Sequence, residues 1–365
     1  MTTTKELRKA LKPIKVKSTN PLHPSNLLST GLTTLNLACS GKAFAGIPKG
    51  KYVLLVGDSA SGKTFLSRAI LAEATLNKHF NNYRLIYDDA EDGAMMDVDK
   101  FFGSDLAERL EPPNGTKAEP KYSSTLEEFY YHVDDAVKTN QPFIYVLDSM
   151  DSLSPEDDLK KFQKKKNARL KGKEETGSYG TAKAKANSSG LRIARNAIKE
   201  NGSILIIIAQ TRDKLDFGFE KKTRSGGHAL RFYADLELWF SIRNKIKRPV
   251  HGKDRQIGTM LRIQIKKNRM TGREATTDVP FYPSHGFDDT GAMVNFLVDE
   301  GYWKVSNKRI NAHDWELVLS EDKLVRHIEQ EGMQGDLRML VSTVWDEIEA
   351  ATTVQRTNRY TKVEE

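Results

Sequence analysis

The sequence has one cysteine, Cys39, so the chain offers no partner for an internal disulfide bond. It also lacks a long hydrophobic run: the longest, such as residues 204–208, fall far short of the ~20 residues that a membrane-spanning helix needs. The first residues, Met1 to Glu6, carry no apolar core of a signal peptide. These absences exclude a disulfide framework and predict a soluble cytoplasmic protein.

Positively charged residues only slightly outnumber negatively charged ones. The 365 residues include 57 Lys and Arg against 49 Asp and Glu, which gives a formal net charge of +8 and a pI of about 9.2. This balance favours an acidic partner, but modestly. The length suits one large domain or two ordinary ones, and the 38% of hydrophobic residues allows a sizeable core.

Short apolar strands alternate with helical stretches through the middle of the chain. We expect strands at residues 52–56, 83–87, 143–147, 203–209, 235–242 and 261–266. Long connections separate the first four, which is typical of an α/β fold with a mostly parallel central sheet flanked by helices. The closer spacing of the last two predicts an antiparallel extension of the same sheet.

The two ends of the chain differ from this middle. Residues 1–27 read as a short N-terminal arm, either a disordered tail or an oligomerisation segment, and residues 28–305 as the core. Residues 306–365 read as a small helical C-terminal unit and tail, with amphipathic helices over 313–332 and 334–350.

One loop fits the phosphate-binding pattern G-x-x-x-x-G-K-[ST], and it stands between an apolar strand and a helix-like segment. Glycines let backbone N–H groups surround phosphate oxygens, the lysine reaches the β- and γ-phosphates, and the threonine hydroxyl binds Mg²⁺. The alternative is a chance glycine turn. The loop consists of Gly57, Asp58, Ser59, Ala60, Ser61, Gly62, Lys63 and Thr64.

Polar residues at the ends of three other strands complete a predicted triphosphate site. Asp148 ends the strand at 143–147 and would hold the Mg²⁺ through water. Glu91 is our candidate for positioning the attacking water, although the chemistry of the acidic cluster at 88–92 alone does not separate it from its neighbours. Gln210, after the strand at 203–209, would sense the γ-phosphate. A solvated acidic turn is the alternative for the cluster.

Two segments that follow buried strands are rich in cations. The first, at about 154–190, has no acidic residue between Lys160 and Lys173, and such a block repels itself unless a polyanion neutralises it. The second, at 212–224, mixes cations with phenylalanines, which suits stacking on single-stranded bases. The alternatives are a solvated face and core phenylalanines. The DNA-binding candidates are Lys164, Lys165, Lys166, Arg169 and Lys171, then Arg212, Lys214, Phe217, Phe219, Lys221, Lys222 and Arg224.

Several strings, in order along residues 28 to about 305, resemble the RecA recombinase family. They are Leu28-Ser29-Thr30-Gly31 through Leu35-Asn36-Leu37-Ala38, Gly46-Ile47-Pro48-Lys49-Gly50, the phosphate loop, Asp89-Ala90-Glu91, Leu147-Asp148-Ser149, Ala209-Gln210-Thr211-Arg212, Ser225-Gly226-Gly227-His228-Ala229-Leu230-Arg231-Phe232-Tyr233-Ala234, Ile265-Lys266-Lys267-Asn268-Arg269 and Gly301-Tyr302-Trp303. The interior of the phosphate loop, the longer first basic segment, the proline-broken arm and the C-terminal unit depart from the bacterial pattern. The chain therefore resembles a divergent, phage-type member.

The resemblance implies roles for the matching residues. Lys63 and Thr64 would bind ATP and Mg²⁺, Asp148 would hold the metal's water shell, and Glu91 would activate water. Gln210 would couple the γ-phosphate to the DNA-binding segments. Lys267 and Arg269 would reach ATP held by a neighbouring subunit. It also implies single- and double-stranded DNA, a helical homo-oligomeric filament, and single-strand-binding and loader proteins as partners.

Three functions follow as hypotheses. The leading one is an ATP-dependent recombinase that forms a filament on single-stranded DNA and promotes homologous pairing and strand exchange. The second is a hexameric helicase or another DNA-dependent ring ATPase built on the same core. The third is a nucleotide-gated DNA-binding or regulatory protein with little hydrolysis.

Overall fold

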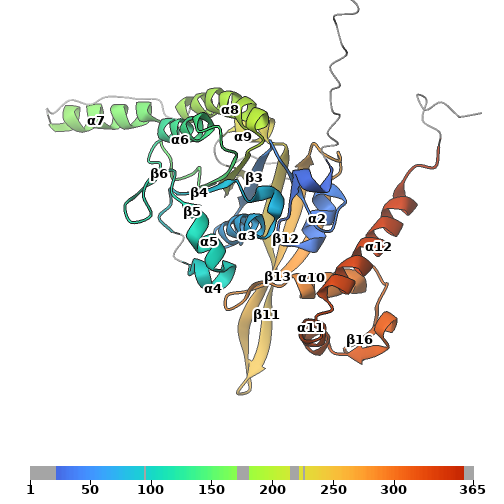
Figure 1. Ribbon diagram of the computed structural model, residues 1–365. Coiled ribbons are helices and arrows are strands. Elements are labelled where there is room, and N and C mark those ends of the chain that lie inside the picture. Colours follow the sequence, from blue (N-terminus) through green and yellow to red (C-terminus); the bar gives the residue numbers. More distant parts are fainter. Residues whose placement is uncertain (1–21, 94–95, 171–180, 214–221, 225–226, 357–365) are drawn as a thin grey trace, which may run out of the picture.

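The computed structural model describes residues 22–93, 96–170, 181–213, 222–224 and 227–356. Its centre is one large sheet with helices on both sides (Figure 1). The predicted arm lies mostly outside the described residues. The strands run in the order β14 (Gly286–Phe287), β13 (Ala275–Tyr282), β12 (Lys253–Asn268), β11 (Leu236–Val250), β3 (Tyr52–Gly57), β9 (Ile204–Asp213), β8 (Phe143–Asp148), β4 (Arg84–Asp89) and β5 (Leu110–Glu111), and β10 (Lys222–Arg224) pairs with β9.

Shorter elements and helices connect and cover these strands. Within the described residues, no helix is long and apolar enough to cross a membrane. The elements are η1 (Pro24–Asn26), β1 (Leu27–Leu28), α2 (Thr33–Ser40), β2 (Ile47–Pro48), α3 (Lys63–Leu76), η2 (Lys78–Phe80), α4 (Val98–Phe102), α5 (Ser104–Arg109), β6 (Asn114–Gly115), β7 (Pro120–Lys121), α6 (Leu126–Lys138), α7 (Glu156–Leu170), α8 (Thr181–Asn201) and α9 (His228–Tyr233).

The sheet has a parallel half and an antiparallel half. Strands β11, β3, β9, β8, β4 and β5 are parallel, whereas β12, β13 and β14 each pair antiparallel with their neighbour. All six predicted strands are present, which confirms the α/β fold and the antiparallel extension. The fifth predicted strand, β11, is still parallel to β3, so the direction changes one strand later than its spacing indicated.

Successive side chains of a strand point to opposite faces of the sheet, and helices cover both faces of the parallel half. In β3, Val53 and Leu55 join a core with α3, and Leu54 and Val56 join a second core with α6 and α8. Every residue of β3 is buried. The apolar run that predicted this strand is thus explained by helices packed on each side of it.

The C-terminal unit is not purely helical. It comprises a three-stranded sheet and two helices that follow α10, and its apolar cluster around Trp303 also includes Leu37 of α2 and Ala43. The helix expected over 313–332 begins only at Glu321, because residues 313–319 form a 3₁₀ turn and a strand. Its elements are α10 (Asp289–Asp299), β15 (Lys304–Ser306), β16 (Arg309–Ala312), η3 (His313–Trp315), β17 (Leu317–Leu319), α11 (Glu321–Gln330) and α12 (Gln334–Thr352).

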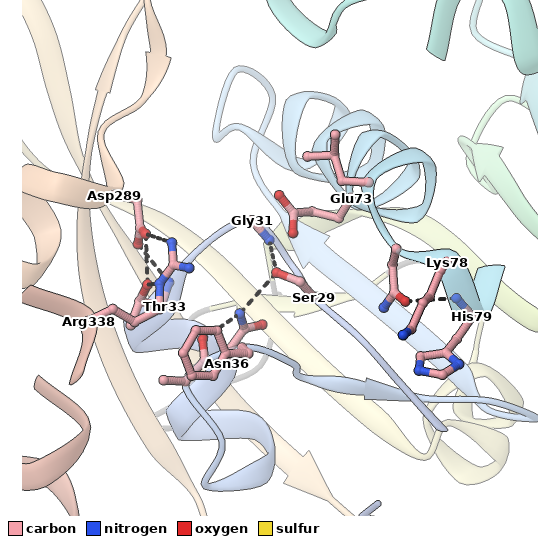
Figure 2. Close-up of a pocket in the computed structure, with 13 residues that line it drawn as sticks. Ser29, Gly31, Thr33, Asn36, Glu73, Lys78, His79, Asp289 and Arg338 are labelled. Atoms are coloured by element: carbon pink, nitrogen blue, oxygen red, sulfur yellow. Dashed lines mark hydrogen bonds and ion pairs between the residues drawn. The ribbon is translucent and has the colours of Figure 1, made fainter. Parts of the chain in front are cut away.

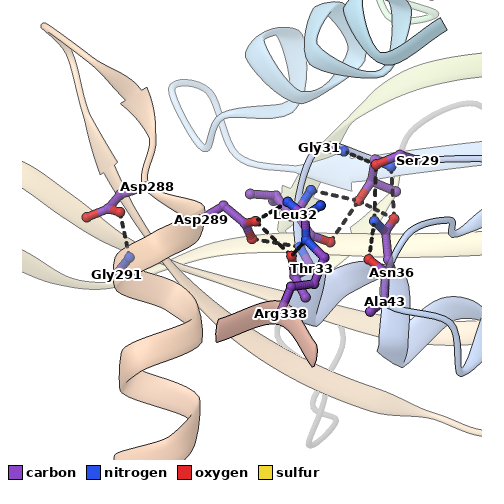
Figure 3. A network of polar contacts seen from close by, with 11 residues as sticks. Ser29, Gly31, Leu32, Thr33, Asn36, Ala43, Asp288, Asp289, Gly291 and Arg338 are labelled. Carbon is purple, nitrogen blue, oxygen red and sulfur yellow. Dashed lines mark hydrogen bonds and ion pairs between the residues drawn. The ribbon is translucent and has the colours of Figure 1, made fainter. Parts of the chain in front are cut away.

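A polar network joins this unit to the start of the core. The Thr33 amide donates to Asp289 at 2.6 Å, the Thr33 hydroxyl donates to the same carboxylate at 2.8 Å, and Arg338 of α12 donates to that hydroxyl at 3.1 Å (Figure 3). Beside it lies a cavity of about 450 Å³ whose lining includes Glu73 and His79 (Figure 2). No phosphate-loop residue lines this cavity, so it is separate from the predicted nucleotide site.

The first predicted DNA-binding segment is largely helical rather than a loop. Lys164, Lys165, Lys166 and Arg169 belong to α7, which extends away from the sheet in Figure 1, whereas Lys171 lies outside the described residues. The helix has three acidic residues in its first turn, where they complement the helix dipole, and an i,i+4 ion pair follows them. This helix lacks an apolar face, so the highly charged sequence showed no periodicity from which it could be predicted.

The second predicted segment begins and ends in a hairpin. Strand β9 continues to Asp213 and pairs antiparallel with β10, with Arg224 opposite Thr211. Arg212, Lys222 and Arg224 therefore belong to paired strands. The remaining candidates, Lys214, Phe217, Phe219 and Lys221, lie outside the described residues.

Candidate nucleotide site

The phosphate loop leaves β3 at Gly57 and enters α3 at Lys63, as the strand–loop–helix pattern predicts. Two of its residues adopt left-handed backbone conformations, Ala60 with φ 57° and Gly62 with φ 88°. A Cβ on Gly57 would meet the Phe240 carbonyl oxygen at 2.7 Å. The tight turn and the close packing against β11 both need glycine, and they leave the start of α3 facing the loop as an anion site.

The Lys63 ammonium lies inside this loop. It donates to the carbonyl oxygens of Gly57 at 2.9 Å and Asp58 at 2.6 Å, and the residue is 6% exposed. Burial lowers the pKa of Lys63, while Asp148 and Glu91 act in the opposite direction. The ammonium also donates to the Ser61 hydroxyl at 3.3 Å, and a buried cation whose hydrogen-bond acceptors are neutral oxygens suits a phosphate that enters the loop.

The predicted metal residues touch each other. The Thr64 hydroxyl donates to Oδ2 of Asp148 at 2.6 Å, and the Tyr87 hydroxyl donates to the same oxygen at 2.7 Å. The second oxygen, Oδ1, is buried without a hydrogen-bond partner among the described residues. Burial raises the pKa of Asp148, and the two hydroxyl donors counteract it.

A buried carboxylate oxygen without a donor suits a hard cation. The Thr64 hydroxyl and Asp148 are oxygen donors of the kind that Mg²⁺ prefers. Among the described residues, no group of three His, Cys, Asp or Glu side chains could hold a metal alone. The residues therefore fit a cation that completes its shell with water and phosphate oxygens. A bound nucleoside triphosphate with Mg²⁺ would supply the phosphoanhydride bond and the positive charge that polarises it.

The structure separates Glu91 from Asp88, another acid of the same cluster. Oε1 of Glu91 accepts from Gln210 Nε2 at 2.6 Å and from the Ser149 hydroxyl at 2.9 Å. Asp88 is instead fully buried and engaged by Ser123 and Tyr145. Glu91 is exposed at the strand ends, where water has access. Of the pair formed by Glu91 and Asp88, only Glu91 is available to a substrate.

Strand register brings these residues together. Gly57 lies opposite Gln210, and Asp89 lies opposite Asp148, so the carboxyl ends of four parallel strands meet at one edge. Three further residues contact the site without a role predicted for them: Tyr87, Ser149 and Asp151. Asp151 accepts from the backbone N–H of Gln210 at 2.6 Å. Tyr87 falls inside a predicted strand, and its polar contact has no sequence signal beyond that position.

Lys267 and Arg269 lie far along the sheet from the phosphate loop. Lys267 is opposite Glu237, which is opposite Leu54 near the start of β3, whereas the loop follows the end of β3. Lys267 donates to the carbonyl oxygen of Phe232 at 3.0 Å, and Arg269 donates to it at 2.8 Å. Burial and then Arg269 lower the pKa of Lys267 to about 8. The two cations do not join the nucleotide site of their own subunit.

Comparison with known proteins agrees with this arrangement. The family model "RecA N-terminal domain" matches residues 14–287. The chain is 26% identical over 357 residues to "Protein RecA" of Malacoplasma penetrans, which covers 96% of this chain and 98% of that protein. It is 26% identical over 340 residues to "Protein RecA, chromosomal" of Lactococcus lactis subsp. lactis, covering 91% and 80% respectively. Because the family match includes the phosphate loop and the strand ends around it, the chain belongs to the RecA family.

Proposed function

We propose that this protein is an ATP-dependent DNA recombinase, which forms a helical filament on single-stranded DNA and promotes homologous pairing and strand exchange. One observation carries the proposal: Gln210 touches Glu91 at 2.6 Å and stands on β9, which runs directly into the second basic segment. This contact supports a coupling in which nucleotide chemistry and DNA binding lie next to each other along one strand. The departures of its phosphate loop and arm favour a phage-type member.

In this proposal Lys63 neutralises the transferred phosphate and Glu91 orients the attacking water. As long as the side-chain amide of Gln210 donates to Glu91, one of the two carboxylate oxygens of Glu91 is already engaged in a hydrogen bond. A γ-phosphate that competes for the side-chain amide of Gln210 would release Glu91 from this hydrogen bond and shift the end of β9. Because coupling free energies are reciprocal, DNA held by the hairpin of β9 and β10 would favour the same arrangement.

Lys267 and Arg269 would act across a subunit interface. Their position at the opposite end of the strands supports contact with a neighbour's nucleotide rather than their own. A head-to-tail interface of this kind builds an open helical filament when the rotation that relates one subunit to the next does not close a ring. A ring motor would arise from the same contacts if the rotation closed.

The test is the ATPase rate with single-stranded DNA, with duplex DNA and without DNA, across a salt series. We expect strong stimulation by single strands that falls steeply with salt, since phosphate contacts release counterions. Glu91→Gln should abolish the stimulated turnover and leave assembly on DNA with ATP intact. Electron micrographs of the same samples should show open filaments. Closed rings would favour the helicase, and a rate indifferent to DNA would overturn the proposal.

A further inference from the structure

The amino ends of the parallel strands carry a polar cluster of their own, opposite the phosphate loop. Its centre is Asp235, which stands directly before β11 and is 3% exposed. Because Leu236 lies opposite Val53 near the start of β3, this aspartate lies at the far edge of the sheet from Gly57. The amide of Asp235 donates to the Tyr52 carbonyl oxygen at 2.9 Å, and the Tyr52 amide donates to the Asp235 carboxylate at 3.2 Å. The carboxylate is therefore fixed relative to β3.

Three cations from separate elements converge on this carboxylate. Arg195 of α8 lies 3.0 Å from its Oδ1, Arg269 after β12 lies at 3.7 Å, and Lys51 before β3 lies at 4.0 Å. A second buried carboxylate, Glu237, pairs with Arg231 of α9 at 3.3 Å. Two buried acids thus tie α8, α9 and the end of β12 to the start of the parallel sheet.

Positive charge is in excess in this cluster. Lys267 stands directly opposite Glu237 across β11 and β12, and its ammonium donates to the carbonyl oxygens of Arg231 and Phe232. With it, five cations surround two buried carboxylates, which leaves a formal excess of three positive charges. An anion that approaches from outside would relieve their mutual repulsion. The cluster comprises Lys51, Arg195, Arg231, Lys267 and Arg269 with Asp235 and Glu237.

Arg269 is held from two sides and still reaches solvent. Its Nη1 faces Asp235, its Nη2 donates to the Phe232 carbonyl oxygen at 2.8 Å, and its backbone N–H donates to the Asp235 carbonyl oxygen at 2.9 Å. Its side chain remains 39% exposed. A guanidinium has five N–H donors, so these contacts fix its orientation and leave others for a phosphate.

We infer that Asp235 and Glu237 are positioning residues, which hold Arg269 and Lys267 in place for the triphosphate of a neighbouring subunit. This role rests on the proposed function, which brings that triphosphate to these two cations. Asp235 orients Arg269 directly. Glu237 acts on Lys267 from the facing strand, and through Arg231 it anchors the end of α9 whose carbonyl oxygens hold the ammonium. Cations oriented in advance contribute more to a transition state than mobile ones.

The ionisation of Lys267 supplies a readout that packing alone does not change. Burial and then Arg269 lower its pKa to about 8, and Arg231 of α9 acts in the same direction. Glu237 and Asp235 oppose them by favouring the ammonium form. The cation is present below this pKa and lost above it. Removing either carboxylate therefore lowers the pKa further, and the charge is lost at lower pH.

The experiment measures steady-state ATPase of the full chain with a single-stranded oligonucleotide, from about pH 6.5 to about pH 9.5. The profile of kcat/KM is used because it reports ionisations of the free enzyme. The variants are Asp235→Asn and Glu237→Gln. The matched control is Asp278→Asn, which removes a carboxylate bound to two arginines elsewhere in the sheet. Circular dichroism at each pH excludes unfolding as the source of a shifted limb.

We expect Asp235→Asn to lower kcat about ten-fold and to change KM for ATP less than about three-fold, because a catalytic cation is misplaced rather than removed. Both variants should move the basic limb of the profile to lower pH, and the control should not. Lys267→Arg replaces the titrating ammonium with a guanidinium that stays charged. In that background the limb near pH 8 should vanish, and Asp235→Asn should add no shift.

A further variant separates this inference from the proposed function. Lys267→Gln combined with Arg269→Gln should abolish the DNA-stimulated turnover. If it does, but the basic limb stays in place in both carboxylate variants or moves equally in the control, the positioning role is overturned and the proposed function stands. If the double variant keeps full turnover, the two cations do not serve a neighbour's nucleotide, and both conclusions fail. Should Asp235→Asn not fold, the limb of Glu237→Gln decides by itself.

Discussion

The two halves of the central sheet place their polar groups in opposite ways. In the parallel half, polar side chains bind one another at the strand ends, as Asp148 does with Thr64 and Tyr87 at the end of the fully buried strand β8. Where the sheet changes from parallel to antiparallel, the hairpin of β11 and β12 carries charged side chains outward. The first half can hold atoms in fixed positions for chemistry. The second exposes charge to solvent.

The largest effect is expected from a substitution in the phosphate loop, at the edge of the parallel half. Lys63→Ala removes the buried cation that contacts the Gly57 and Asp58 carbonyls. We expect the rate of phosphate release to fall at least about 100-fold, because a preorganised charge in a dry site contributes several kcal/mol to a transition state. Lys42→Ala, at an exposed lysine, is the control. A Lys63→Ala protein that still assembled on DNA with ATP would count heavily against the proposed coupling.

The next effect tests how closely the helices cover the parallel half. Gly190 of α8 faces the ring of Tyr130, and a Cβ there would lie 2.4 Å from ring carbons. Gly190→Ala should lower the free energy of unfolding by about 1–3 kcal/mol through overpacking, despite its better helix propensity. Gly335→Ala in α12, where nothing lies within 4 Å, should be neutral or stabilising. Urea unfolding midpoints compare the two, and equal midpoints would mean that α6 and α8 separate easily.

Residues 203–209 illustrate what the sequence could predict. A buried parallel strand is a continuous apolar run, so this segment and the phosphate loop were recognisable from local pattern. Gly190 was not recognisable as a packing position, because its partner Tyr130 is on another helix. The helix α7 was missed for the opposite reason: Lys164 to Lys166 read as charge, and no apolar periodicity marked their helix.

The candidate nucleotide site, too, could be predicted from the sequence only in part. The acidic cluster at 88–92 was correctly placed at a strand end, but residue types alone did not distinguish its members. The distinction comes from long-range contacts, since Asp88 binds Ser123 and Glu91 binds Gln210. Such partners lie far apart in sequence and are brought together only by strand register.

A smaller effect concerns the ionisation of Asp148. Burial raises its pKa, and the hydroxyl of Tyr87 opposes this by donating to the ionised form. Tyr87→Phe removes that donor, so the pKa rises further and the acidic limb of the ATPase pH profile should move to higher pH. Activity at pH 8 should fall by about ten-fold or less, because one hydrogen bond to a charged group contributes about 1.5 kcal/mol.

The control for this change is Tyr145→Phe, which removes a similar hydroxyl from Asp88 at 2.6 Å. Asp88 lies outside the proposed chemistry, so the acidic limb should stay in place. If both variants shift the limb equally, the profile reports general stability of the sheet rather than ionisation of Asp148. Thermal unfolding measured at each pH separates these explanations.

The smallest effect is expected from a substitution next to the point where the hairpin of β11 and β12 leaves the sheet. Asp278 of β13 accepts from Arg262 at 2.8 Å through both oxygens and from Arg243 at 2.6 Å. Asp278→Asn should lower the free energy of unfolding by about 1 kcal/mol or less, because exposed arginines are screened by water. The difference should shrink in 1 M salt, where the screening length is about 3 Å. Asp134→Asn, in an exposed pair with Lys138 on α6, should cause no measurable change. A loss at Asp278 that persists in high salt would mean that shape, rather than charge, holds the hairpin to the sheet.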